Sequence, residues 1–488
     1  MKLDELFKGI HYELIKGNKE TLIFDICYIS KKVKPGDLFV AIIGNNDDGH
    51  NYINDAISHG AIGVIVSKNI DIPDNILVIK VDNTKKIMTK LAMNLFNYPQ
   101  SKLKTIAITG TKGKTTTSFM IKSIIESTGQ SCGLIGTTGV YIGGDYYENK
   151  NTTPEGYDII KHMNEMVNHG ISYVVMEVSS QALKYDRVND IIFDYGIFTN
   201  LTKDHIGPLE HDSMLDYMES KSKLFKQCNY GIFNIDSKYF YKIVSRGSCE
   251  INTYGYDIKA DLRAKDIKLI NEPNFIGVLI DLEGVINDSF KVSSPGKFSS
   301  YNAMAAILTC YLLGIDVSFM KKALEHFSVK GRVEPVKVSD DFLLLIDYAH
   351  NGISTKSILS TIRQYNPGRI VTIFGCGGNR SRERRYEMGA IASQYSDKCI
   401  ITEDNNRYEK FADIAKDILR DFDKKCEYIL IPDRKNAIKY AIENGKKGDI
   451  IMLLGKGHEN YKEINGIRYP FDERIIIKEI LNELKKTN

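Results

Sequence analysis

The stretch Thr109-Gly110-Thr111-Lys112-Gly113-Lys114-Thr115-Thr116 lies between a predicted buried strand at 105–109 and a predicted helix at 115–127. Gly110 and Gly113 allow the backbone to curl so that several N–H groups face one anion, and the helix N-terminus adds partial positive charge. Lys114 can reach the terminal phosphates of a nucleotide, and the Thr115 hydroxyl can ligate Mg²⁺. The pattern G-x-x-G-K-T therefore predicts a nucleoside triphosphate site. The alternative is a Gly- and Thr-rich turn that binds nothing.

The composition of the chain restricts the number of domains, the partners and the cellular location that we expect. The chain has 488 residues, of which 43% are hydrophobic and 26% charged, and this length predicts about three globular domains. The net charge is +3, from 65 basic and 62 acidic side chains, so we expect no nucleic-acid partner. No apolar run approaches the roughly 20 residues of a membrane span, so we expect no membrane insertion. Eight scattered cysteines without a C-x-x-C pair, and an N-terminus unlike a signal peptide, predict a cytoplasmic location.

Strand and helix patterns divide the chain into three parts around the glycine loop. Residues 1–100 read as a small α/β unit, and residues 101–333 alternate strands, such as 173–176 and 195–198, with helices. This alternation predicts a parallel sheet covered by helices on both faces. Residues 334–488 form a third, Rossmann-like unit. The predicted fold class is therefore α/β in three domains, with a central domain that holds the phosphate loop.

The third part places polar residues directly after its predicted strands. Strands are expected at 342–346, 370–374, 399–402, 428–431 and 450–454. Polar clusters follow four of the five, at 347–350, 375–378, 404–407 and 455–459. Ligands of open α/β sheets bind beyond the carboxyl ends of the strands. These clusters therefore predict a ligand site at that edge.

Three further residues are ambiguous when they are read one at a time. Glu177 ends a strong predicted strand, where it could hold Mg²⁺ or could be an N-cap or a solvated carboxylate. A lone histidine such as His205 is more often structural than a metal ligand, because Mg²⁺ prefers oxygen. Lys221 reads as one basic residue on a solvated helix, and by itself it indicates no function.

Taken in order, these segments resemble the Mur ligase family, whose members use ATP to form the amide bonds of the peptide in bacterial cell-wall precursors. The resemblance covers nearly the whole chain, and residues 33–41 and 48–50 look like the family's nucleotide-sugar domain. The order of the later motifs is that of the branch that adds the third residue. The resemblance implies ATP-dependent addition of meso-2,6-diaminopimelate to the D-Glu γ-carboxylate of UDP-N-acetylmuramoyl-L-Ala-D-Glu, through an acyl phosphate. It also implies ATP and Mg²⁺ as cofactors, small-molecule substrates and a monomer.

The same resemblance assigns residues to the activating half of the site. Catalytic roles fall to Lys114, Glu177, His205 and Lys221. The implied ATP-binding residues are Gly110, Thr111, Lys112, Gly113, Lys114, Thr115, Thr116, Asn302, Arg332 and Asp347. The implied metal ligands are Thr115, Glu177, His205 and Lys221, the last as a carbamate, which replaces an ammonium by anionic oxygen. The implied contacts to the UDP-muramoyl dipeptide are Ser30, Asn151, Thr152, Thr153, Ser179, Tyr185 and Arg187.

The incoming amino acid is expected in the third domain. The residues that the resemblance assigns to it are Arg385, Asp404, Asn405, Asn406, Arg407, Gly455 and Glu459. Residues 404–407 resemble the Asp-Asn-Pro-Arg motif of the diaminopimelate-adding branch. Diaminopimelate differs from lysine by a second carboxylate, which the fork of a guanidinium group can distinguish. Glu459 is expected to hold the distal ammonium group.

Several positions depart from the family pattern and leave alternatives for the substrate. Asn406 replaces the proline of the motif, Tyr185 stands where glutamine is usual, and Ile29-Ser30-Lys31 replaces Asp-Ser-Arg. The amino acid could instead be meso-lanthionine or L-lysine. The chain could also act on a different acceptor, as folylpolyglutamate or cyanophycin synthetases do. A nucleotide-binding regulator without catalysis is the alternative outside the ligases.

Overall fold

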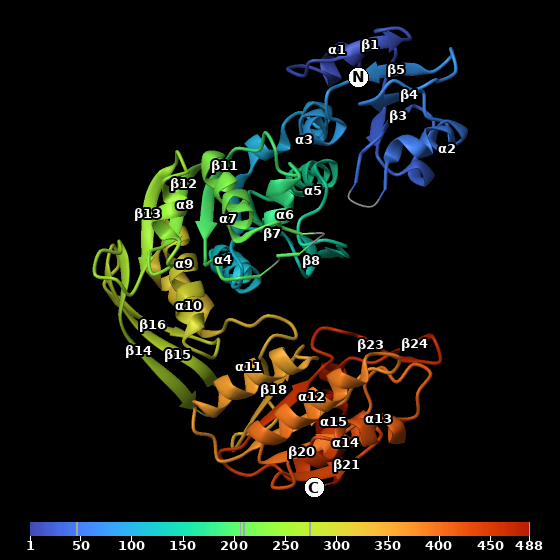
Figure 1. Cartoon of the computed structure of the whole chain (residues 1–488). Coiled ribbons are helices and arrows are strands. Elements are labelled where there is room, and N and C mark those ends of the chain that lie inside the picture. The colour runs from blue at the N-terminus through green and yellow to red at the C-terminus, as the bar shows by residue number, and fades with distance from the viewer. Residues whose placement is uncertain (45–46, 205, 208–209, 273–274, 488) are drawn as a thin grey trace. The chain divides into compact units, whose positions relative to one another are not determined.

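The computed structural model describes residues 1–44, 47–204, 206–207, 210–272 and 275–487 (Figure 1). The chain divides into two compact units. The first comprises Met1–Arg263, Gly284–Ile286 and Tyr301–Ala323, and the second comprises Ala264–Glu283, Asn287–Ser300 and Leu324–Asn488. Both consist of sheets covered by helices, which confirms the predicted α/β class. In the described ranges, no helix combines the length and apolar character needed to cross a membrane.

The first unit begins with a five-stranded sheet in the order β1-β5-β4-β3-β2. Its strands are β1 (Glu13–Lys16), β2 (Asp25–Cys27), β3 (Asp37–Val40), β4 (Gly63–Val66) and β5 (Leu77–Lys80). The helices are α1 (Leu3–Leu6), α2 (Ile53–Ser58) and α3 (Thr84–Leu95), with short 3₁₀ turns at η1 (Ser30–Lys32), η2 (Gly49–Tyr52) and η3 (Pro99–Lys102). Every residue of β3 and β4 is buried, because side chains on both faces enter a core.

A larger sheet carries the phosphate loop. Within the first unit its order is β13-β12-β11-β6-β10-β7-β8-β9. The strands are β6 (Lys104–Thr109), β7 (Cys132–Gly136), β8 (Gly139–Ile142), β9 (Asp145–Tyr147), β10 (Tyr173–Glu177), β11 (Phe193–Phe198), β12 (Cys228–Asn234) and β13 (Glu250–Gly255). The strands from β13 to β7 are parallel, as predicted. β8 and β9 are antiparallel, because two-residue turns join β7, β8 and β9.

Strand register gathers the residues of the activating site at one edge of this sheet. Glu177 at the end of β10 pairs with Ile108 of β6, and Phe198 at the end of β11 pairs with Thr109. The phosphate loop, Glu177 and Thr199 therefore leave the sheet at the same edge. The helices around this sheet are α4 (Lys114–Ser127), α5 (Gly156–Asn168), α6 (Ser180–Lys184), α7 (Met214–Ser222), η4 (Lys223–Lys226), α8 (Phe240–Val244), α9 (Phe298–Leu312) and α10 (Val317–Glu325).

Long strands continue the sheet from the first unit into the second. β14 (Leu262–Glu272) begins beside β13, where Leu262 pairs with Tyr254. β15 (Phe275–Gly284) and β16 (Asp288–Val292) then pair with each other in antiparallel fashion. These three strands were not predicted from the sequence.

The second unit contains a six-stranded sheet in the order β17-β18-β22-β19-β20-β21. Its strands are β17 (Glu334–Val336), β18 (Leu343–Asp347), β19 (Ile370–Phe374), β20 (Lys398–Ile401), β21 (Glu427–Leu430) and β22 (Ile450–Leu454), and β23 (Tyr461–Ile464) and β24 (Ile467–Pro470) form a separate hairpin. The helices are α11 (Gly352–Arg363), α12 (Arg382–Tyr395), α13 (Phe411–Ile418), α14 (Arg434–Glu443) and α15 (Glu473–Thr487). Apolar cores lie on both faces of the sheet. The five strands predicted here are all present and parallel, as a Rossmann-like sheet requires.

Candidate active site

The phosphate loop has the backbone shape that its glycines predict. Gly110 and Gly113 have φ angles of +152° and +87°. A Cβ atom on Gly110 would lie 1.9 Å from Thr199 Oγ1, and one on Gly113 would lie 2.4 Å from Asn302 Oδ1. Asn200 braces the loop, because its Oδ1 accepts from Lys112 N at 3.0 Å and its Nδ2 donates to Lys112 O at 2.9 Å. A larger residue at either position would displace Thr199 or Asn302, so the two glycines let the loop pack closely against these side chains.

Two lysines converge on this loop. Lys114 Nζ donates to the carbonyl oxygen of Gly110 at 2.9 Å, and Lys221 Nζ, from α7, donates to the same oxygen at 3.0 Å. Lys221 is buried rather than solvated, so the prediction of a solvated helix position was wrong. Burial lowers the pKa of both lysines, and in Lys221, where the nearby Lys114 charge adds to the effect, the pKa falls well below 10.5.

Glu177 is fully buried beside the loop, which excludes a solvated role. Its Oε2 accepts from Thr115 Oγ1 at 3.0 Å and from Thr137 Oγ1 at 2.9 Å, and its Oε1 accepts from Thr137 N at 3.2 Å. Burial raises the pKa of Glu177, and the Lys114 charge opposes this rise. A carboxylate and a hydroxyl in contact form an oxygen donor set that suits Mg²⁺. His205, the other predicted ligand, lies outside the described residues.

Four of the seven residues expected to contact the dipeptide lie close to Glu177. Thr153 Oγ1 donates to the Glu177 carbonyl oxygen at 2.9 Å and accepts from Ser179 N at 3.0 Å. Arg187 donates to the Thr153 carbonyl oxygen at 3.0 Å. Thr152 Oγ1 lies 3.0 Å from Thr137 Oγ1, the hydroxyl that binds Glu177. The fold therefore places Thr152, Thr153, Ser179 and Arg187 close to Glu177 and the phosphate loop.

Within the part of the first unit that the structure describes, cavities lie between the small N-terminal sheet and the central sheet. One of about 640 Å³ is lined by Ser30, Lys31 and Arg187, and a neighbouring one of about 720 Å³ by Asn151. Tyr185 lines neither, and instead it lines a third cavity of about 380 Å³. Lys85 Nζ lies 4.8 Å from the centre of the Tyr185 ring, and Lys85 lines both the first and the third cavity. Nothing in the sequence had singled out Lys85.

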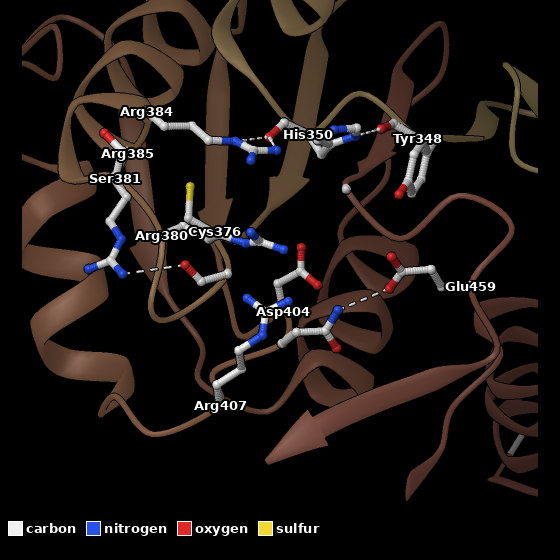
Figure 2. Close-up of a pocket in the computed structure, with 14 residues that line it drawn as sticks. Tyr348, His350, Cys376, Arg380, Ser381, Arg384, Arg385, Asp404, Arg407 and Glu459 are labelled. Carbon is white, nitrogen blue, oxygen red and sulfur yellow. Dashed lines mark hydrogen bonds between the residues drawn. The ribbon is translucent and has the colours of Figure 1, made fainter. Parts of the chain in front are cut away.

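In the second unit, the four polar clusters meet in one pocket of about 140 Å³, as their positions after the strands predict (Figure 2). The clusters follow β18, β19, β20 and β22. The predicted residues that line the pocket are Arg385, Asp404, Asn405, Arg407, Gly455 and Glu459. Asn406 is buried, but it is not among the lining residues.

Arg385 does not act as the free clamp that was expected. Its side chain is 1% exposed, and its guanidinium group binds Glu409 through two bonds of 2.7 and 2.8 Å and Asp417 at 2.9 Å. These carboxylates already occupy the groups that would bind a substrate carboxylate. Arg380, by contrast, is exposed, and its side chain extends into the pocket (Figure 2). The role of Arg385 therefore stays a prediction, and Arg380 is a second candidate for a ligand carboxylate.

The loop after β20 holds its pocket residues tightly. Arg407 has a left-handed backbone with φ +50°, which is uncommon for a residue with a side chain. Its side chain donates to Gly378 O at 2.7 Å and to Glu463 Oε2 at 3.2 Å. Asn405 Nδ2 donates to Glu459 Oε2 at 3.0 Å. The hairpin β23–β24, which includes Glu463, thus fixes one side of the pocket.

The remaining predicted nucleotide contacts belong to different units. Asn302 lies in the first unit, with its Oδ1 3.5 Å from Thr117 Oγ1. Arg332 and Asp347 lie in the second unit, where the Asp347 carboxylate accepts from Val333 N at 2.9 Å and from Ala349 N at 2.8 Å. Burial raises the pKa of Asp347. Asp347 therefore links the segment before β17 to the end of β18.

Comparisons with known proteins agree with this geometry. Three family models match, described as the Mur ligase family catalytic domain at 25–96, the Mur ligase middle domain at 108–310 and the Mur ligase glutamate ligase domain at 331–457. A protein of Caldanaerobacter subterraneus, named UDP-N-acetylmuramoyl-L-alanyl-D-glutamate--2,6-diaminopimelate ligase, is 41% identical over 100% of both chains. The chain belongs to the Mur ligase family. It is accordingly an ATP-dependent ligase.

Other Mur ligases support the same conclusion. A Clostridium acetobutylicum protein, named as the first of two such diaminopimelate ligases, is 40% identical over 99% of this chain and 100% of its own. A solved structure titled with the same enzyme name is 25% identical, with a TM-score of 0.75 over 99% of both chains. The folylpolyglutamate synthase of Mycobacterium tuberculosis, solved with ADP and AMPPCP, shares only the fold, at 14% identity and a TM-score of 0.56 over 76% of this chain and 92% of its own.

Proposed function

We propose that this Mur ligase adds meso-2,6-diaminopimelate to the D-Glu γ-carboxylate of UDP-N-acetylmuramoyl-L-Ala-D-Glu during synthesis of peptidoglycan precursors. The observation that carries the proposal is the mixed charge of the pocket in the second unit. Arg380 and Arg407 line it together with Asp404 and Glu459. The full-length relatives from Caldanaerobacter and Clostridium bear the name of this activity.

Diaminopimelate matches that pocket in charge. It carries two carboxylates and two ammonium groups, whereas L-lysine has only one carboxylate. Arg380, in place of the predicted Arg385, supplies a guanidinium group that can bind a carboxylate through two hydrogen bonds. Arg407 adds a second positive charge, although Glu463 and Gly378 already take part of its donor set. Asp404 and Glu459 supply acceptors for an ammonium group. Discrimination against L-lysine then comes from the distal carboxylate of diaminopimelate, which L-lysine lacks and which these arginines can bind.

The activating half of the site supports phosphoryl transfer from ATP. The γ-carboxylate of D-Glu attacks the γ-phosphorus of ATP, which gives an acyl phosphate and ADP. The amine of the incoming amino acid then attacks the acyl carbon, and phosphate leaves. Lys114 and the loop N–H groups stabilise the charge on the transferring group. Thr115 and Glu177 would hold Mg²⁺, which when bound neutralises phosphate charge.

Lys221 is proposed to act as a carbamate. In that reaction a neutral amine adds CO₂, loses a proton and becomes an anion. The lowered pKa of Lys221 favours the neutral amine, and burial shields the product from water. We also propose His205 as a further ligand at this site, on the family resemblance alone.

The N-terminal cavities are proposed to take the UDP-sugar and its dipeptide, with Ser30, Asn151 and Arg187 among the contacts. We further propose domains at 1–100, 101–333 and 334–488, a monomeric state and a cytoplasmic location. The eight free cysteines support a reducing compartment.

One assay tests the proposed function. Purified protein is given ATP, Mg²⁺ and UDP-N-acetylmuramoyl-L-Ala-D-Glu, with meso-diaminopimelate, L-lysine or meso-lanthionine in parallel reactions. We expect phosphate release and a new UDP-linked tripeptide that depend on both substrates, with meso-diaminopimelate giving the highest kcat/KM. If L-lysine were the best acceptor, the assignment of Arg380 and Arg407 to the distal carboxylate would be wrong. Phosphate release without either substrate would indicate a simple ATPase.

A further inference from the structure

Lys456 places a cation in the interior of the second unit, directly beside the amino-acid pocket. It follows β22 and is 0% exposed, although lysine is among the residues least often buried. Burying an ammonium group is costly unless hydrogen-bond acceptors surround it. The hydrogen-bond acceptors around Lys456 therefore indicate the role of its positive charge.

Four oxygen atoms lie within 3.3 Å of Lys456 Nζ. Three belong to side chains that line the pocket, namely Asn405 Oδ1 at 2.9 Å, Asp404 Oδ1 at 3.2 Å and Glu459 Oε2 at 3.3 Å. The fourth is the carbonyl oxygen of Tyr461, at 2.8 Å. Lys456 itself is not among the lining residues. Lys456 therefore contacts these three pocket-lining side chains from behind the pocket wall and not from inside the pocket.

These contacts fix the orientation of the Asn405 amide. Its Oδ1 accepts from Lys456 Nζ and also from Glu463 N at 2.9 Å, and both partners can only donate. Nδ2 must therefore be the end that meets Glu459 Oε2, at 3.0 Å. Because Nδ2 carries two hydrogens, one N–H remains for a ligand. Asn405 can present a donor to the pocket and cannot turn to present an acceptor.

Lys456 also allows two carboxylates to share the pocket. Asp404 and Glu459 both contact its ammonium group, and without that charge they would repel each other. Two ionised carboxylates that keep their positions can together attract a substrate ammonium group. The positive charge that stabilises them lies behind the pocket wall, so it does not occupy the place of the ligand.

We propose that Lys456 is a positioning residue that sets the charge pattern of the amino-acid pocket. It holds Asn405 with its N–H toward the substrate carboxylate, and it holds Asp404 and Glu459 in place for the substrate ammonium. This inference rests on the proposed function, because it requires an amino acid to bind in this pocket. A purely structural lysine would affect stability but would leave amino-acid binding unchanged in the folded protein.

The test compares Lys456→Met with Lys462→Met in the full-length protein. Lys462 is a matched control, because it pairs with Glu403 and does not line the pocket. We expect Lys456→Met to raise the KM for meso-diaminopimelate by about 10- to 100-fold, the range expected for loss of a charge-assisted hydrogen bond. The KM for ATP should change by less than about twofold in both variants, since the phosphate loop is built by other residues.

A second pair of variants covers the case in which Lys456→Met does not fold. Glu459→Gln alone is compared with Lys456→Met/Glu459→Gln, which removes one positive and one negative charge together. We expect the double variant to fold and to have a KM for meso-diaminopimelate about tenfold above that of Glu459→Gln. Equal KM values in these two proteins would overturn the positioning role. An inactive wild-type enzyme would refute the proposed function instead, so the two failures are distinguishable.

Discussion

Two lysine side chains share one carbonyl oxygen in this site, and this contact has a chemical consequence. Lys114 and Lys221 both donate to Gly110 O, and burial together with the neighbouring charge lowers the pKa of Lys221 well below 10.5. We expect Lys221→Ala to lose about 100-fold or more in kcat, because it removes the proposed anion. Short-chain carboxylates should restore part of the rate in the phosphate-release assay. Lys223→Ala, which alters a half-exposed lysine on the same segment, is the control. Full activity of Lys221→Ala would rule out the carbamate.

Substitutions of Arg380 and Arg385 should have different effects, because Arg380 is proposed to bind the amino acid whereas Arg385 stabilises the fold. Arg385→Ala leaves two carboxylates without their buried partner, so we expect a loss of about 3–5 kcal/mol in the free energy of unfolding. Arg380→Ala should leave the melting temperature unchanged and raise the KM for meso-diaminopimelate by about tenfold or more. Denaturant melts and steady-state kinetics on both variants check this pair. An unchanged KM in Arg380→Ala would exclude its proposed contact.

This pair also shows where sequence reasoning stops at the residue scale. Four arginines fall within residues 380–385, and the family resemblance assigned the carboxylate contact to Arg385. The arginines of this pair differ because α12 begins at Arg382 and turns Arg385 toward Glu409 and Asp417. Those two carboxylates lie 24 and 32 residues further along the chain, so no local pattern could reveal the contact. Lys85 and Lys456 were missed for the same reason.

Among the elements, buried parallel strands were predictable and exposed hairpins were not. β19 and β22 are entirely buried, and their apolar runs predicted them with the observed ends. β9 and β24 are entirely exposed, so no apolar run marks them. Their positions depend on turns and on neighbouring strands, yet Glu463 of β23 holds Arg407 and Asn405, which line the pocket. This support of the pocket was therefore not visible in the sequence.

Glu177, at the end of β10, is buried, and its negative charge lowers the stability of the folded protein. Burial raises its pKa above 4.5, so the ionised group is less stable in the folded state than in the unfolded chain. The resulting loss of stability is absent well below pH 4.5, grows as pH rises from 4.5 to the raised pKa, and is constant above that pKa. We expect Glu177→Gln to be more stable than the wild type at pH 7.5, with the difference shrinking near pH 4.5, and to be inactive. Denaturant melts in metal-free buffer at both pH values check this, and a wild type that is the more stable at pH 7.5 would contradict it.

At the scale of the whole molecule, the two halves of the reaction belong to different units. The phosphate loop and Glu177 lie in the first unit, and the amino-acid pocket lies in the second. Under the proposed function, the amine of the incoming amino acid must reach the acyl carbon at roughly 3 Å. A closed complex would also keep water from the acyl phosphate.

We therefore expect small-angle X-ray scattering to change when a non-hydrolysable ATP analogue, the UDP-linked dipeptide and meso-diaminopimelate are added together. The ATP analogue alone should change the scattering profile less, because no amino acid then fills the pocket of the second unit. Arg380→Ala offers a matched control, since its weakened amino-acid binding should shift the change to higher meso-diaminopimelate concentration. A profile that stays the same with all three ligands at saturation would contradict ligand-driven assembly of the site.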